Sequence, residues 1–230
     1  MEECHNKDWK EYMSNLTIKL LKDEAKKFSI VESDHDEPSI FGSTDGKAVG
    51  TYLEHKFKKY LEKKYTFTKG NSASGIDFPC KVINTDIKVT SITQPQSSCP
   101  FKSARQKIYG LGYNLLVFVY EKLDNNKTKT SRLNILHTVF VDKSRTGDFQ
   151  LTTSINSILE NNGNKDDLVS LFFDKNLPID EIGASSLAEE ILKNRPNTGY
   201  LTISNALQWR LQYSRIIEKA GSIEGIFRLK

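Results

Sequence analysis

The chain has 230 residues, enough for one large domain or for a catalytic domain with a small appendage. Its residues are 37% hydrophobic and 27% charged, which is typical of a globular protein that forms a core without disulfide bonds. The net charge of +4, from 33 lysines and arginines against 29 acidic residues, permits a polyanionic partner without establishing one.

The cysteines and the chain start indicate the cellular compartment. Cys4, Cys80 and Cys99 lack C-x-x-C spacing, so we expect neither a disulfide framework nor a zinc ribbon. The first residues are charged and contain no apolar run, so we expect no signal peptide. No stretch approaches the length of a membrane span. These features predict a cytoplasmic protein with reduced thiols.

The N-terminal third predicts two helices joined by a linker. Residues 8–28 form an amphipathic helix, because apolar side chains recur there at helical spacing. Residues 31–47 collect Ser, Asp and Gly and predict a loop. A second helix runs from residue 46 to about 64, with an apolar stripe of Val49, Leu53, Phe57, Tyr60 and Leu61. We therefore expect residues 1–47 to precede the main core.

The middle of the chain predicts most of a sheet. Strands are expected at 65–68, 75–79 and 85–91, a loop at 92–100 and a short basic helix at 101–109. The continuous apolar run 115–120 suits a strand buried on both faces, and another strand follows at 133–141. Residues 48–142 thus predict the order α-β-β-β-α-β-β, within a core of residues 48–145.

The last part, residues 146–230, is expected to be helical. Helices are predicted near 151–162, 166–175 and 185–194, then a longer one at 203–219 and a short strand at 226–229. Helix, turn, polar helix and strand is the order of a winged helix-turn-helix, with Arg210 and Arg215 on the polar helix. A helical cap on the core, or a dimer face, explains the same pattern equally well.

Three charged residues in strand-like segments are the candidate catalytic group. Asp86 and Lys88 are two apart on one predicted strand, so their side chains leave the same face. Asp77 lies on the preceding segment across a short turn. Two carboxylates meet the preference of Mg²⁺ for oxygen ligands, and the lysine is suited to position or deprotonate an attacking water or to stabilise charge on a phosphate. The alternative is that all three are solvent-facing charges of a half-exposed hairpin.

These residues also carry a family resemblance. Gly75-Ile76-Asp77, followed by Asp86-Ile87-Lys88 in the predicted α-β-β-β-α-β frame, resembles the PD-(D/E)XK nuclease superfamily. The run from Asp86 to Ser98, with the basic helix behind it, resembles a type II restriction endonuclease of that superfamily. The resemblance covers about residues 48–142. Ile76 stands where the motif's proline is expected, and Asp86 is an allowed second acid.

The resemblance implies a restriction-endonuclease-like core, a mixed sheet flanked by helices, and a role for each motif residue. Asp77, Asp86 and the main-chain carbonyl of Ile87 would bind Mg²⁺, and Lys88 would be the catalytic lysine. A further ligand often comes from the preceding helix, where Glu54 is the candidate. Glu54 also falls on the apolar flank of its predicted helix, where a carboxylate needs a partner. That partner is either the metal or a lysine such as Lys58.

Several polar residues are candidates for DNA contact. A glutamine amide can pair with adenine, which suggests the loop residues Gln94 and Gln96, and cations can contact phosphates, which suggests Lys102 and Arg105. On the polar helix, Arg210 and Arg215 could contact guanine. The alternative for the glutamines, Lys102 and Arg105 is that they are ordinary solvated surface residues, and the alternative for the polar helix is a packing or dimer element. The histidines show no metal-ligand spacing.

We therefore predict a Mg²⁺-dependent type II restriction endonuclease that cuts both strands of duplex DNA. A C₂ homodimer is expected, because symmetric cutting of a palindromic site favours it. One alternative is a repair or recombination nuclease that recognises DNA structure. Another is a non-catalytic winged-helix DNA-binding regulator.

Overall fold

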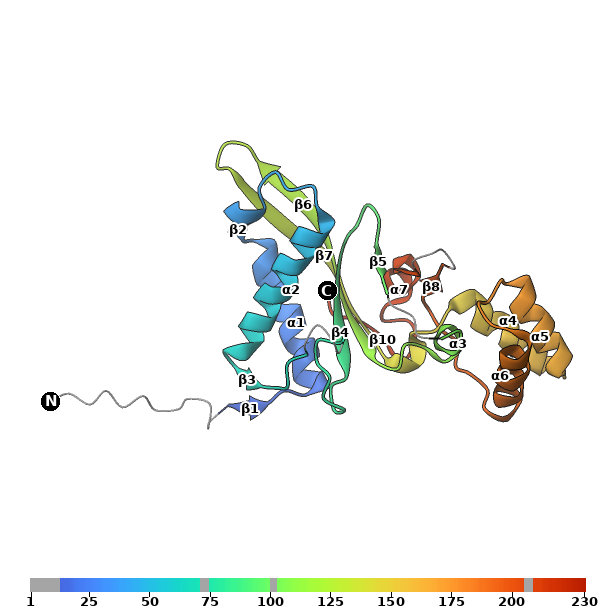
Figure 1. The fold of residues 1–230 in the computed structure, drawn as a ribbon. Coiled ribbons are helices and arrows are strands. Elements are labelled where there is room, and N and C mark those ends of the chain that lie inside the picture. The colour runs from blue at the N-terminus through green and yellow to red at the C-terminus, as the bar shows by residue number, and fades with distance from the viewer. Residues whose placement is uncertain (1–12, 71–74, 100–102, 205–208) are drawn as a thin grey trace.

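The structure is a computed structural model that describes residues 13–70, 75–99, 103–204 and 209–230 (Figure 1). The helices are α1 Ile18–Ser33, α2 Gly46–Glu62, α3 Arg105–Tyr109, α4 Phe149–Glu160, α5 Lys165–Asp174, α6 Glu181–Lys193 and α7 Ser214–Lys219, with the 3₁₀ turns η2 Pro38–Ile40 and η3 Lys143–Arg145. The strands are β1 Ser14–Asn15, β2 Asp36–Glu37, β3 Tyr65–Thr66, β4 Thr85–Ser91, β5 Gln96–Ser98, β6 Asn114–Asn125, β7 Thr130–Val141, β8 Thr202–Ile203, β9 Arg210–Gln212 and β10 Ile226–Arg228.

The main sheet is mixed, as predicted. Its order is β10-β7-β6-β4, and β2 pairs with the far end of β7. β4 runs parallel to β6, whereas β6, β7 and β10 pair antiparallel. β6 contains the predicted apolar run, and its residues Leu115–Val119 are fully buried because both sheet faces are covered. The predicted α/β class with a mixed sheet flanked by helices is confirmed.

Different parts of the chain cover the two faces of this sheet. α1 and α2 lie along one face, where Phe28 and Phe57 pack on Phe118 of β6 with ring centroids 6.0 and 5.2 Å away (Figure 1). On the other face, Tyr213 and Leu211 join one apolar cluster with the β6 and β7 side chains. The segment after residue 200 therefore helps to complete the sheet's own core.

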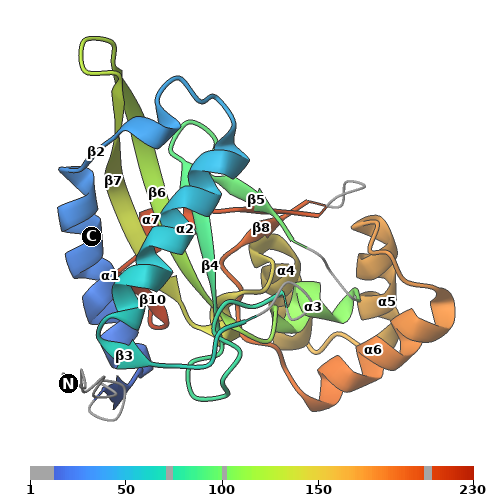
Figure 2. The same cartoon turned by 60° about the vertical axis from the view of Figure 1, so that its left-hand side comes forward.

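A small second sheet joins the middle of the chain to its end. β9 is its central strand, with β5 on one side and β8 on the other. β5 follows β4 by one short turn, so this sheet extends directly from an edge strand of the main sheet. Helices α4, α5 and α6 have a separate apolar core and stand beside the sheets (Figure 2).

The predicted N-terminal helix is displaced. α1 begins at Ile18, where the Thr17 side chain accepts a hydrogen bond from the Leu20 amide at 3.3 Å, and it continues to Ser33. Residues 8–12 of the predicted helix lie outside the described residues, and Ser14–Asn15 pairs with β3 as a strand. The predicted loop at 31–47 contains the end of α1, β2 and η2.

The predicted long helix at 203–219 is wrong. The described residues of that segment form the end of β8, then β9, and the six-residue helix α7, while residues 205–208 lie outside the described part. Arg210 and Gln212 are exposed while Leu211 and Tyr213 are buried, which is the two-residue period of a strand. The helical spacing of Leu207, Leu211 and Ile216 concealed this alternation. The helix order of a winged helix-turn-helix is therefore not found among the described residues.

The predictions for 75–79 and 101–109 were partly wrong. The first segment contributes one isolated antiparallel bridge, Phe78 to Thr85, rather than a strand. The second forms the five-residue helix α3. Neither Cys80 nor Cys99 forms a disulfide bond among the described residues, and no described helix is long and apolar enough to cross a membrane.

Glu24 of α1 fastens the two helices of the first face together. Its buried carboxylate accepts hydrogen bonds from Tyr60 and Lys64, both at 2.6 Å, and from Lys27 at 2.8 Å. Burial alone would raise the pKa of Glu24, but these three donors lower it to about 2.

We expect Glu24→Gln to destabilise the protein by about 2 kcal/mol at pH 7, because a charged, hydrogen-bonded acceptor is lost. A lowered folded-state pKa stabilises the protein above the usual value of 4.5, and this contribution disappears as the pH falls towards 2. Urea denaturation at pH 7 and pH 3 measures the difference. Glu121→Gln, at an exposed position, is the control. A gap between Glu24→Gln and wild type that does not narrow at pH 3 would contradict this account.

Candidate active site

The candidate site is built on the free edge of β4. Among the described residues, β4 pairs with β6 on one side and ends the sheet on the other. Asp86 and Lys88 lie on β4 as predicted, and their side chains leave the same face. Main-chain hydrogen bonds in both directions between Phe78 and Thr85, at 3.0 and 3.1 Å, bring Asp77 beside this edge.

Asp77 binds the edge of the strand directly. The Ile87 amide donates to Asp77 Oδ2 at 2.7 Å, so the carboxylate satisfies a donor that no strand pairs. In a β-strand the N–H and C=O of one residue point to the same side. The carbonyl of Ile87 therefore also faces the free edge, next to Asp77.

Asp86 and Lys88 form an ion pair inside the site. Lys88 Nζ lies 2.7 Å from Asp86 Oδ2. Asp86 is buried, with a side chain that is 6% exposed, so the ammonium offsets part of the cost of burying this carboxylate.

The two carboxylates have opposite pKa shifts. Burial raises the pKa of Asp86, Lys88 opposes the shift and the neighbouring Asp77 carboxylate adds to it. Burial also acts to raise the pKa of Asp77, but hydrogen bonds from Lys58 and from the Ile87 amide outweigh it and leave the value below its usual range. Two neighbouring carboxylates with pKa values shifted in opposite directions are common in functional sites.

Glu54 is held by a lysine, which was the alternative to a metal role. Lys58 lies one turn after Glu54 on α2 and donates to Glu54 Oε1 at 2.6 Å. The same ammonium also donates to Asp77 Oδ1. Lys58 thus connects a helix on one sheet face with the free edge of β4. The sequence suggested only its i, i+4 contact with Glu54, because the contact with Asp77 requires the folded chain.

These residues line one hollow of about 380 Å³. It contains the side chains of Glu54, Lys58, Asp77, Asp86 and Lys88, together with Ile87, His55 and the short segment before Asp77. No three His, Cys, Asp or Glu side chains of the described part are arranged as a ready metal cluster. The oxygen donors still fit a divalent cation, since the carboxylates of Asp77 and Asp86 flank the main-chain carbonyl of Ile87 at the free edge of β4.

The structure separates the DNA-contact candidates into two groups. Arg105 is paired with Glu190, and its Nε atom lies 3.0 Å from each carboxylate oxygen. Arg215 stacks on the Phe149 ring, with its guanidinium carbon 3.8 Å from the ring centroid. Arg215 therefore packs within the fold rather than on a projecting helix. Lys102 lies outside the described residues.

The second group lies on or beside the small sheet. Gln94 is exposed in the turn after β4, Gln96 begins β5, and Arg210 is exposed at the start of β9. The sequence predicts these residues on two separate elements. Gln212, which pairs directly with Gln96, was not among the predicted DNA-contact residues. The alternation from Arg210 to Tyr213 was the signal that could have identified it.

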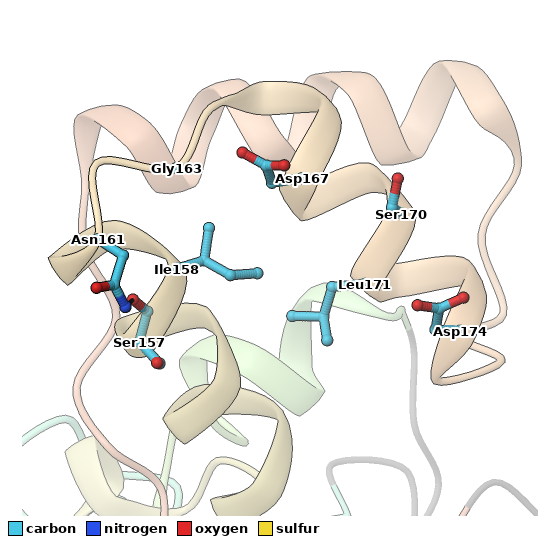
Figure 3. A pocket seen from close by; sticks show the side chains of 8 residues that line it. All are labelled: Ser157, Ile158, Asn161, Gly163, Asp167, Ser170, Leu171 and Asp174. Atoms are coloured by element: carbon cyan, nitrogen blue, oxygen red, sulfur yellow. Dashed lines mark hydrogen bonds between the residues drawn. The ribbon is translucent and has the colours of Figure 1, made fainter.

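A second hollow, of about 440 Å³, lies on the helical part between α4 and α5 (Figure 3). Asp167 and Asp174 are its charged lining residues, and no lysine or arginine lines it. A polyanion would be repelled there, so this hollow is not the candidate nuclease site.

Comparison with known proteins assigns the chain to a family. The family model described as Type II restriction enzyme NspV matches residues 15–228. The chain belongs to this family of type II restriction enzymes. The Type II restriction enzyme NspV of Nostoc sp. (strain ATCC 29411 / PCC 7524) is 62% identical over 214 residues, which cover 93% of this chain and 96% of that protein. No solved structure matches the chain.

Membership of the NspV family confirms the prediction that the protein is a type II restriction endonuclease. The match spans the N-terminal helices, the sheets and the helical part together. The resemblance drawn from the motif segment covered only the middle of the chain, so the family relationship extends well beyond it.

We expect Lys58→Met to destabilise the metal-free protein by about 1–3 kcal/mol, because Glu54 and Asp77 lose the cation between them while the aliphatic stem is kept. Thermal melting in EDTA measures the loss. Added Ca²⁺ should then stabilise this variant more than wild type, since the exposed carboxylates bind the cation.

Lys59→Met, at an exposed position on the same helix, is the matched control. Equal melting temperatures for Lys58→Met and wild type in EDTA would show that the ion pair does not hold the site together.

Proposed function

We propose that the protein is a Mg²⁺-dependent endonuclease that hydrolyses phosphodiester bonds in both strands of duplex DNA at a defined sequence. The observation that carries the proposal is the group Asp77, Asp86 and Lys88 at the free edge of β4, in a chain of a type II restriction enzyme family. The double-stranded DNA substrate follows from that family's name.

For the metal, we propose Asp77, Asp86 and the carbonyl of Ile87 as ligands. Glu54 lines the same hollow and is proposed to act through a metal-bound water, because Mg²⁺ usually keeps several waters. When bound, the ion would polarise a phosphoryl oxygen and help to generate the attacking hydroxide.

Lys88 supplies the positive charge on the phosphate side of this group. An ammonium only donates hydrogen bonds, so it can orient the attacking water and stabilise negative charge that develops on the phosphate. Its side chain is 19% exposed and its ammonium is 2.7 Å from Asp86, which restricts where that charge sits. A fixed charge stabilises a transition state without reorganisation at the moment of reaction.

We propose the predicted catalytic core unchanged, but we divide the predicted helical C-terminal part in two. Residues 48–145 contain every proposed catalytic residue and are proposed as a restriction-endonuclease-like core. α4, α5 and α6 form a separate helical layer, whereas β9 and β10 pair with β5 and β7 of the preceding part, and β8 pairs with β9. A C₂ homodimer and a cytoplasmic location remain predictions of the sequence.

The direct test is digestion of a defined plasmid with Mg²⁺, followed by sequencing of the ends. Discrete fragments with one common end sequence are expected. Cleavage confined to branched or mismatched DNA would instead support a structure-specific repair nuclease. Binding without any metal-dependent cleavage would support a DNA-binding regulator.

We expect Asp77→Asn and Asp86→Asn each to abolish cleavage but to retain or strengthen DNA binding. The amide weakens metal binding, and the loss of a negative charge reduces repulsion of phosphate. Plasmid cleavage measures the first effect, and duplex binding in Ca²⁺ the second. Asp174→Asn, at an exposed position on α5, is the control. Near wild-type cleavage by Asp86→Asn would overturn the metal assignment.

Lys88→Ala is expected to slow cleavage by about 10²-fold or more, the range of a positioned catalytic group. Single-turnover cleavage measures the rate, and thermal melting verifies that the variant folds. Lys59→Ala provides the comparison at an exposed site. An unchanged turnover in Lys88→Ala would remove this residue from the mechanism.

A further inference from the structure

The small sheet has two unlike faces. Ser97 and Leu211 are paired across β5 and β9, and Leu211 and Tyr213 point into the core. The next positions along each strand point the other way. That outer face carries Gln96, Gln212 and Arg210 with Ser98, and both Gln212 and Arg210 are exposed.

The outer face is ordered in rows. Gln96 of β5 lies opposite Gln212 of β9, and Thr202 of β8 lies on the other side of Gln212. In the second row, Ser98 lies opposite Arg210. Two amides therefore stand side by side next to a guanidinium on a short antiparallel ribbon. None of these five side chains is acidic or apolar, apart from the methyl group of Thr202.

The ribbon is attached to the catalytic strand. Thr90 lies on β4 two residues beyond Lys88 and on the same face. Its buried hydroxyl accepts a hydrogen bond from the main-chain N–H of Gln96 at 3.0 Å. The hydroxyl also lies 3.1 Å from the Gln94 and Gln96 carbonyls. Two residues of strand span roughly 7 Å, about the rise of two base pairs. If a DNA phosphate binds at Lys88, the bases that Gln96 could contact lie within a few base pairs of it.

We propose that the outer face of the β5–β9 ribbon contacts base edges in the major groove, with Gln96, Gln212 and Arg210 as specificity-determining residues. This inference rests on the proposed function. The major groove admits a two-stranded ribbon. A glutamine amide matches the N6 and N7 edge of adenine, and a guanidinium matches O6 and N7 of guanine.

The test uses the site found by plasmid digestion, so the proposed function is examined first and separately. Binding of wild type and variants to the cognate duplex, and to every single-base substitution of it, is measured in Ca²⁺. Gln96→Ala and Gln212→Ala are expected to reduce discrimination at an adenine position by about 5- to 150-fold, and Arg210→Ala to do the same at a guanine position. Gln150→Ala, exposed on α4, should leave all values unchanged.

A second measurement does not depend on the variants folding. Wild-type protein is tested on cognate duplexes in which single adenines or guanines are replaced by their 7-deaza analogues, which lack N7. Weaker binding at specific purines is expected.

Two results would overturn the proposal while leaving the nuclease function intact. One is sequence-specific cleavage by wild type together with insensitivity to every 7-deaza substitution. The other is an equal loss of affinity for all sequences in Arg210→Ala and the two glutamine variants, with a smaller salt dependence, which would identify the ribbon as a phosphate-contacting surface.

Discussion

The hydrogen bond from the Ile87 amide to Asp77 is the contact on which the rest of the candidate site depends. An edge strand exposes main-chain donors and acceptors that must find partners. Here one donor is satisfied by a carboxylate, and the same contact places that carboxylate beside Asp86 and the Ile87 carbonyl. Three oxygen donors meet because β4 has no strand on this side in the described part of the chain.

Bringing these acids together creates a charge problem that two lysines partly solve. Glu54, Asp77 and Asp86 supply three negative charges and Lys58 and Lys88 two positive ones when all five are ionised, which gives the hollow a net charge of −1 in that state. Lys58 neutralises the helix side of the group, and Lys88 the strand side. The remaining negative charge and the grouped oxygen donors favour a divalent cation. With the cation present the hollow would have a charge of +1, which suits a phosphate group.

β4 also connects the two proposed activities of the protein. Asp86, Lys88 and Thr90 alternate on one face of the strand, so cleavage chemistry and support of the β5–β9 ribbon share seven residues of backbone. The ribbon is held from the other side by Leu211 and Tyr213 in the core of the main sheet. A base-contacting surface supported in this way keeps a fixed distance from the catalytic group, because neither can move without disturbing a packed sheet.

The sequence by itself determined the elements whose local pattern is strong. The apolar run of β6 and the stripe of α2 were predicted correctly because burial imposes a clear period, and Asp86 and Lys88 were paired because alternate residues of a strand share a face. Only the tertiary structure decided that Lys58 bridges Glu54 and Asp77, since those carboxylates are joined across a helix and a sheet edge. It likewise decided that residues 210–212 form a strand. Their partner strand β5 lies more than a hundred residues earlier in the chain. Pairing with such a distant strand can override a local spacing that suits a helix equally well.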